Sequence, residues 1–383
     1  MKYLHIVPGA DDIANGMARV ARLLAKEQGD AEVVDLSAVS GQSLAVSSQR
    51  LAVSEEMLAV RDGDGKVEPC RGVEEEFGIR SQWLGDSCEE VWVHGMWLPR
   101  EWVICWRVLR AGKRLVRMTH GSLSPVYLKL QGRWKKWLVG PIERYWLRKA
   151  ERIVATCDAE KEWIEAYLGK KCPEMEIVDL KRFFDFSRVE RVEGDESVFN
   201  AEAQRRRGAE NDELHLLYLG RRHPLKGVEF LERAVKELGV RSQGIGVRDV
   251  ENNSKLETRN IELKIVSNAF GEELEKVWDW CDVLVLPTLS ETFGLVVAEA
   301  LERGKRVITT DGAPVWEELG VRGQELAVSG QKLVVSGQGL AVSGDGCGIG
   351  VGCGGRLLYL KGFRDGSETE RVRLLKDALM MMV

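Results

Sequence analysis

Apolar residues in this chain of 383 residues follow two spacings. Short unbroken apolar runs are typical of parallel strands that are covered on both faces, and segments with apolar residues every three or four positions are typical of helices. Because the two kinds of segment alternate, the pattern predicts an α/β fold. The expected strands are 4–7, 91–93, 115–118, 214–219, 261–266, 282–287 and 356–360, and the clearest helices are 17–26, 228–238 and 368–382.

The segment 281–300 sets two acidic residues around an expected helix start. A short polar connection follows strand 282–287, and helical spacing resumes at Phe293, so Glu291 lies just before or in the first turn and Glu299 further along the helix. A helix N-terminus at the carboxyl end of a parallel strand suits a phosphate, and carboxylates can bind sugar hydroxyls. The alternative is an ordinary helix-cap acid at Glu291 and a solvated helix residue at Glu299.

A second group of candidate residues follows strand 214–219. Arg221 and Lys226 lie five residues apart on one loop between a strand and a helix. Two cations in this position can converge on a diphosphate, the arginine through a bidentate fork and the lysine as a point charge. The alternative is a solvated loop, which is the usual place of a surface cation.

The two motifs together resemble the donor-binding half of family 4 glycosyltransferases. The pattern G-R-x4-K-G is followed about sixty residues later by P-T-x-x-E-x-F-G-x4-E-A, and the similarity covers 214–318 well. The resemblance implies the GT-B fold, in which two Rossmann-like domains have parallel sheets that face across a cleft. It also implies a retaining transfer of a sugar from a nucleotide-diphosphate donor, with no metal and no other cofactor required. A nucleotide-sugar epimerase of the same fold, or an inactive nucleotide-sugar-binding scaffold, is the alternative.

The resemblance also implies roles for individual residues. Arg221 and Lys226 would hold the donor diphosphate, Glu299 the ribose, and Glu291 would lie near the donor sugar. Gly16, before helix 17–26, would approach the phosphates. The implied donor-binding set is Gly16, Arg221, Lys226, Glu291, Phe293, Gly294, Leu295 and Glu299.

Two predicted strands of the N-terminal half run into His-Gly, at His94 and at His120. The segments VHGMWLP and VRMTHGSLSP resemble a bacterial subgroup of family 4 that builds surface polysaccharides or lipopolysaccharide. In that subgroup the histidine that matches His120 lies near the reacting sugar, so the implied catalytic set is His120, Glu291, Arg221 and Lys226. The alternative for each histidine is a hydrogen bond to backbone at a strand end.

Length and patterning predict two domains, an acceptor-side domain over 1–185 and a donor-binding domain over 186–383. Each carries a low-complexity insertion of seven-residue repeats, at about 41–66 and about 323–354. We interpret both as insertions in surface loops, which cost little loop-closure entropy, with pairing between repeats as the alternative.

Charge and composition restrict the partners and the compartment. The net charge of −5 argues against general nucleic-acid binding, and the chain shows neither an apolar run near 18 residues nor a signal-peptide core, so we expect a cytoplasmic protein. Cys105, Cys157 and Cys281 lie in apolar contexts and are expected to be reduced.

The segment 113–152 contains eleven Lys or Arg residues and two Glu, interleaved with aromatic residues. Such a segment can lie at the inner face of a membrane, where a lipid-linked or glycan acceptor would be delivered. The alternative is a solvated helical hairpin whose tryptophans face the core.

Overall fold

The structure is a computed structural model of the whole chain. It describes residues 2–10, 12, 15–37, 60–61, 67–68, 88–132, 135–187, 214–239, 241–244, 261–267, 269, 271–317, 325–326, 348–352 and 356–382. Nearly all of both predicted repeat insertions lies outside the described residues. The chain forms two compact units: the first holds 1–119, 134–154 and 171–176, and the second holds 120–133, 155–170 and 177–383. The expected domain boundary at residue 185 stays a prediction.

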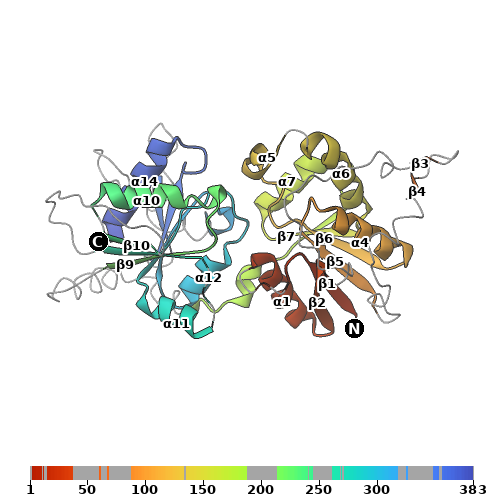
Figure 1. Cartoon of the computed structure of the whole chain (residues 1–383), viewed down its shortest axis with the longest axis horizontal. Helices are drawn as coiled ribbons and strands as arrows, with labels where there is room; N and C mark the ends of the chain where they lie inside the picture. The colour runs from red at the N-terminus through yellow and green to blue at the C-terminus, as the bar shows by residue number, and fades with distance from the viewer. Residues whose placement is uncertain are drawn as a thin grey trace. The chain divides into compact units, whose positions relative to one another are not determined.

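The N-terminal sheet has six strands in the order β2-β1-β5-β6-β7-β8, and the pairs from β2 through β7 are parallel (Figure 1). Its strands alternate with helices along the chain, as the apolar pattern predicted. The strands are β1 Tyr3–Val7, β2 Ala31–Asp35, β5 Glu90–His94, β6 Arg114–Met118, β7 Arg152–Ala155 and β8 Glu174–Ile177. The helices are α1 Gly16–Gln28, α4 Pro99–Arg110, α5 Pro125–Leu130, a π-helical segment η3 Lys135–Val139, α6 Gly140–Lys149 and α7 Asp158–Leu168.

The C-terminal sheet has eight strands in the order β10-β11-β9-β12-β13-β16-β15-β14. Its strands are β9 Leu214–Leu219, β10 Arg241–Gly244, β11 Ile261–Val266, β12 Val283–Leu286, β13 Arg306–Thr310, β14 Glu325–Leu326, β15 Gly348–Gly352 and β16 Leu357–Lys361. The helical elements are η4 Leu180–Phe183, η5 Pro224–Lys226, α10 Val228–Glu237, α11 Gly271–Trp280, α12 Leu295–Glu302, η6 Pro314–Trp316 and α14 Glu368–Met382. A separate two-stranded ladder joins β3 Val60–Arg61 and β4 Val67–Glu68.

The C-terminal sheet is parallel except for two strands at one edge. The pairs from β10 through β16 are parallel, but β15 runs antiparallel to β16, and β14 runs antiparallel to β15. Only four residues separate β15 from β16, and a parallel crossover needs a dozen or more. The rest of the sheet keeps the parallel order that places loops at its carboxyl edge.

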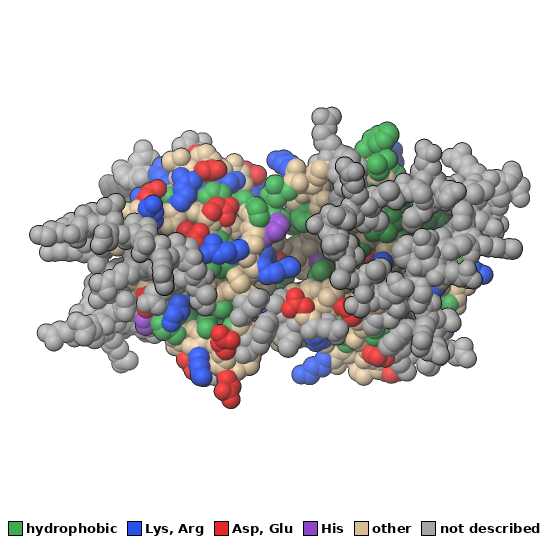
Figure 2. Space-filling view, viewed as in Figure 1, with side chains coloured by type: hydrophobic (Ala, Val, Ile, Leu, Met, Phe, Trp, Pro, Cys, Tyr) green, Lys and Arg blue, Asp and Glu red, His purple; other side chains and the backbone are tan. Residues whose placement is uncertain are grey.

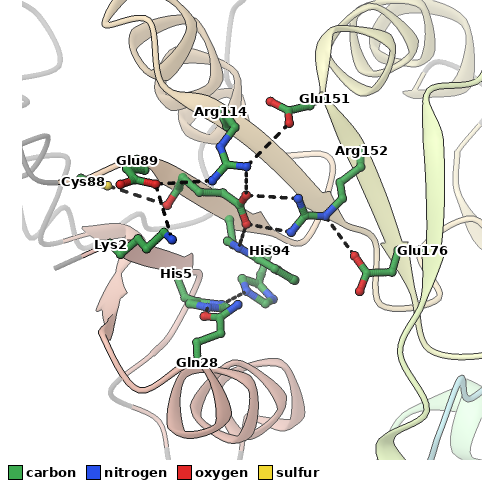
Figure 3. A network of polar contacts seen from close by, with 12 residues as sticks. Lys2, His5, Gln28, Cys88, Glu89, His94, Arg114, Glu151, Arg152 and Glu176 are labelled. Atoms are coloured by element: carbon green, nitrogen blue, oxygen red, sulfur yellow. Dashed lines mark hydrogen bonds and ion pairs between the residues drawn. The ribbon is translucent and has the colours of Figure 1, made fainter.

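A buried polar network ties together the start of the N-terminal sheet (Figure 3). Glu90 is 1% exposed and accepts hydrogen bonds from both terminal nitrogens of Arg152 at 2.8 and 3.1 Å. His5 and His94 are both fully buried, and their rings share a hydrogen bond of 2.9 Å. His94 thus lies at a strand end, and the partner that the structure shows for its ring is a side chain of a neighbouring strand, whereas the alternative reading expected a bond to backbone.

Cys105, Cys157 and Cys281 are free and buried, as predicted. Burial raises the pKa of the Cys105 and Cys157 thiols to about 11. They are therefore unreactive core residues at neutral pH.

Candidate functional site

The loop after β9 carries the two predicted cations, and local contacts determine its shape. Tyr218 Oη donates a hydrogen bond of 2.9 Å to the carbonyl of Arg221. His223 caps the short helix η5 by accepting from the amide of Leu225 through Nδ1 at 3.2 Å. The Arg221 side chain is exposed, whereas Lys226 ends η5 with a side chain that is 25% exposed.

Gly227 allows the loop after β9 to touch the loop after β12. Its φ of +61° lies in the left-handed region, and a Cβ there would lie 2.1 Å from the carbonyl oxygen of Pro287. Two hydrogen bonds to the Leu225 carbonyl continue the contact, one from the Leu289 amide at 2.7 Å and one from Thr288 Oγ1 at 3.0 Å. Only a residue without a side chain fits between these backbones.

This contact brings Lys226 and Glu291 together as an ion pair. The Glu291 side chain is 24% exposed, so the pair is partly accessible to water. The Glu291 amide also donates a hydrogen bond of 2.7 Å to the carbonyl of Gly312, which fixes the backbone of Glu291 to the loop that follows β13. The sequence placed both residues at the site but did not indicate that they pair.

The helix after this loop begins later than expected. Helix α12 starts at Leu295, and Gly294 precedes it with φ +68° in the left-handed region. Phe293 is therefore outside the helix, because the chain must pass through the left-handed residue before helical geometry starts. Phe293 is 2% exposed and its carbonyl accepts a hydrogen bond from Trp316 Nε1. Glu291 lies just before the helix, which is one of the two positions predicted from the sequence.

Glu299 lies in the second turn of α12 and is 5% exposed. This burial excludes the alternative of a solvated helix residue. A buried carboxylate needs hydrogen-bonding or charged partners, so Glu299 is placed to bind other groups rather than to keep the helix surface in contact with water.

His120 lies directly after β6 and has φ +50°, which is unusual for a residue with a side chain. Desolvation lowers the pKa of its imidazole to about 3, so the ring is neutral at physiological pH. The following turn packs on the Glu291 loop within the second unit: a Cβ on Gly121 would lie 2.7 Å from Thr292 Cγ2, and Ser124 Oγ lies 2.6 Å from Ser290 Oγ. His120 therefore belongs to the same unit as Arg221, Lys226 and Glu291.

Gly16 is the first residue of α1, in the first unit. Asn15 caps this helix by accepting from the Met17 amide at 3.0 Å and donating to the Pro8 carbonyl at 2.6 Å. A Cβ on Gly16 would meet nothing within 4 Å, so local packing does not require glycine there. Its predicted approach to a phosphate stays a prediction.

Sequence reasoning missed several residues that shape the site. Gly227 and Gly312 let the loops approach, and a Cβ on Gly312 would lie 2.1 Å from the Thr288 carbonyl oxygen. Glu160 binds the turn after His120. Gly227 could have been found from the motif letters, but no local signal marks Gly312 or Glu160, because the contacts through which they shape the site join them to residues far away in sequence.

Charges on the described surface are mixed. On the face shown in Figure 2, Lys and Arg side chains are interspersed with Asp and Glu. Within the part of the chain that the structure describes, no group of three or more His, Cys, Asp and Glu side chains could hold a metal ion. Among the same residues, no helix is long and apolar enough to cross a membrane.

Comparison with protein families finds a match in each half of the chain. Residues 15–178 match the model of a glycosyl transferase 4-like domain, and residues 213–334 match that of glycosyl transferases group 1. The second match contains Arg221, Lys226, Glu291 and Glu299.

Curated relatives match part of the chain. A D-inositol 3-phosphate glycosyltransferase of Pseudarthrobacter chlorophenolicus is 28% identical over 182 residues, 42% of this chain and 40% of the relative. A protein of the same name from Streptomyces coelicolor is 34% identical over 192 residues, 43% of this chain and 42% of the relative. The matched part therefore spans about two fifths of these relatives.

Solved structures show the same fold. Sucrose-phosphate synthase from Thermosynechococcus elongatus has a TM-score of 0.50 at 16% identity, over 84% of each chain. Anabaena HepE in complex with UDP-glucose has a TM-score of 0.50 at 13% identity, over 100% of this chain and 94% of that chain. Residues 15–178 and 213–334 thus resemble two glycosyl transferase domain models, and the chain has the GT-B fold of its structural neighbours, with two parallel-sheet α/β domains.

Proposed function

We propose that this protein is a retaining hexosyltransferase of family 4 that moves a sugar from a nucleotide-diphosphate donor to a surface glycan or lipid-linked acceptor. One observation carries the proposal. Lys226 and Glu291, from two loops that are locked together through Gly227, meet beside the start of α12. A cation, an acid and free helix amides at the carboxyl end of parallel strands suit a phosphate and a sugar together.

In this proposal Lys226 exchanges partners when the donor binds. Its ammonium pairs with the Glu291 carboxylate in the free protein, and the donor diphosphate would replace that carboxylate. Arg221, which is exposed on the same loop, would add a bidentate contact to the diphosphate. Glu291 would then be released to bind the donor sugar, and buried Glu299 would bind the ribose.

The chemical step would rest on positioning and on charge stabilisation. Arg221, Lys226 and the amides at the start of α12 would stabilise the departing diphosphate, which helps to deprotonate the acceptor. His120 is neutral at physiological pH, so its ring can donate or accept a hydrogen bond near the sugar without adding charge. This scheme requires no protein nucleophile and no metal.

Calorimetric titration with UDP, GDP, ADP and dTDP tests the donor site. Binding of one nucleotide that is lost in Arg221→Ala would support the proposal and identify the base. Arg222→Ala is the matched control, because Arg222 lies on the same loop but pairs with Glu232 at 2.6 Å. Absence of binding to all four nucleotides, or equal loss in both variants, would contradict the proposed site.

Turnover distinguishes the enzyme from an inactive binding protein, and product analysis distinguishes it from an epimerase. A transferase releases the nucleoside diphosphate and joins the sugar to an acceptor. Phosphorylated inositol is a second acceptor class to test, since curated relatives are named D-inositol 3-phosphate glycosyltransferases.

We further propose that α6 and the preceding η3 contact an anionic membrane surface. Hydrophobic side chains gather over this segment (Figure 2), and Trp137 is 78%, Leu138 54% and Tyr145 41% exposed. The alternative that the tryptophans face the core therefore does not hold for Trp137. Glu143, the only acid of α6, is buried against Trp97 and Trp102. The exposed residues of α6 include three cations, Arg144, Arg148 and Lys149.

Exposed aromatic and apolar side chains beside cations suit the interface of an anionic bilayer, where each cation contributes about 1 kcal/mol. Sedimentation with phosphatidylcholine vesicles that do or do not contain phosphatidylglycerol tests this contact. We expect binding only with the anionic lipid, and loss of binding in Trp137→Ser/Leu138→Ser. Met380→Ser removes an apolar side chain of α14 that is 53% exposed and serves as control. Equal binding by all three proteins would contradict the proposal.

A further inference from the structure

Glu160 is a fully buried acid that binds the turn after His120. It lies near the start of α7, and both of its carboxylate oxygens accept hydrogen bonds. Oε1 accepts from the Gly121 amide at 2.6 Å, and Oε2 accepts from the amide and the hydroxyl of Thr156 at 2.8 and 2.9 Å. The Thr156 bonds are local to the start of α7, but the Gly121 bond spans 39 positions of sequence.

The Gly121 bond constrains the backbone of His120. The amide that Glu160 binds belongs to the peptide group between His120 and Gly121. His120 has φ +50° and Gly121 has φ +73°, so two consecutive residues are in the left-handed region. A residue with a side chain stays in this conformation only where its surroundings hold it there. The carboxylate of Glu160 supplies such a restraint, because its hydrogen bond from the Gly121 amide is charge-assisted and, at 2.6 Å, short.

The other side of the turn packs on the Glu291 loop. Gly121 lies against Thr292, and the hydroxyls of Ser124 and Ser290 are in hydrogen-bond contact. The turn is therefore held from α7 on one side and from the Glu291 loop on the other. Loss of the Glu160 bond would remove the restraint from the α7 side.

We infer that Glu160 is a positioning residue for sugar transfer, which holds the His120–Gly121 peptide so that the imidazole of His120 keeps its place relative to the Glu291 loop. This inference rests on the proposed function for the role of His120. Glu160 itself need not touch either substrate, because its two oxygens are occupied by Gly121 and Thr156.

The first test does not depend on activity. We would measure the titration of the His120 imidazole by NMR in the full chain and in Glu160→Gln, which keeps the side-chain shape but replaces one acceptor oxygen with an NH₂ group. The pKa of His120 is about 3 in the wild type because the ring is desolvated. We expect it to rise by at least one unit when the turn loosens and the ring gains water.

Two control variants separate positioning of the turn from capping of the helix. Thr156→Val removes the hydroxyl bond to Glu160 but leaves the Gly121 bond, so it should lower stability without changing the His120 titration. Glu162→Gln changes an exposed acid of the same helix and should change neither. If Glu160→Gln does not fold, Glu160→Asp keeps both oxygens on a shorter stem and is expected to shift the titration in the same direction. An unchanged His120 titration in the folded variant would overturn the inference.

The second test uses release of UDP from UDP-glucose as the readout. Because Arg221 and Lys226 lie on another loop, Glu160→Gln should lower kcat at least tenfold and change KM by less than twofold. A larger change in KM than in kcat, or no change in either, would overturn the positioning role. If the wild type binds none of UDP, GDP, ADP and dTDP and releases none of them from the matching nucleotide sugars, the donor assignment fails, while the NMR titration still decides whether Glu160 positions His120.

Discussion

Lys226 can be changed in a way that separates donor binding from stability. The substitution Lys226→Met keeps the aliphatic stem and removes the ammonium. The ion pair with Glu291 is about one quarter exposed on each side, so its loss should lower the free energy of unfolding by at most about 1 kcal/mol. A charge-assisted hydrogen bond from Lys226 to a phosphate contributes roughly 1.5 to 3 kcal/mol. The dissociation constant of UDP, or of whichever nucleoside diphosphate the calorimetric titration identifies in its place, should therefore rise roughly 10- to 150-fold.

Glu291→Gln is the matched control for Lys226→Met. It breaks the same ion pair, so its effect on urea denaturation should equal that of Lys226→Met. It leaves the ammonium in place and removes the carboxylate that competes with phosphate, so UDP should bind as well as to the wild type or more tightly. UDP is the ligand of choice because it lacks the sugar that Glu291 is proposed to bind. Equal loss of UDP affinity in both variants, or none in Lys226→Met, would refute the assignment of Lys226 to the diphosphate.

Four further predictions follow from particular residues. Glu299→Ala should weaken UDP binding measured by calorimetry, and unchanged affinity would remove Glu299 from the ribose site. Gly227→Ala places a Cβ against the Pro287 carbonyl at a left-handed position, so urea denaturation should show that the free energy of unfolding falls by about 1 to 3 kcal/mol. The control is Gly29→Ala, which is also at a left-handed position but where a Cβ meets nothing within 4 Å. Its free energy of unfolding should fall only by the cost of the strained backbone. Burial lowers the pKa of His5 to about 4 from 6.5, so between pH 6.5 and 4 His5 is protonated in the unfolded chain but stays neutral in the folded chain. Stability should fall by about 3 kcal/mol between pH 6.5 and 4 and then level off, and His5→Gln should lack this component of the pH profile. EDTA should leave sugar transfer intact, and activity that is lost with EDTA and restored by Mg²⁺ would contradict the metal-independent scheme.

The strands and helices could be predicted because each is encoded within a few residues of sequence. The runs 214–219 and 261–266 coincide with β9 and β11, and 368–382 coincides with α14. Apolar spacing reports which face of an element is buried, and in a parallel sheet nearly every strand residue is buried, so the signal is strong. The signal fails where backbone conformation rather than hydrophobicity sets the boundary. Phe293 fits the helical spacing of α12, but the helix begins only at Leu295, because Gly294 between them has a left-handed backbone conformation.

The sequence alone determined the α/β pattern and the candidate residues Arg221, Lys226, Glu291 and Glu299, because motif spacing and apolar periodicity are local properties. Tertiary structure alone decided how these residues meet. The Lys226–Glu291 pair depends on Gly227 against Pro287, and the turn of His120 depends on Glu160, which is 39 positions away from Gly121. Such contacts arise from close approach of backbones and from burial of polar groups, and the packing of distant segments determines both.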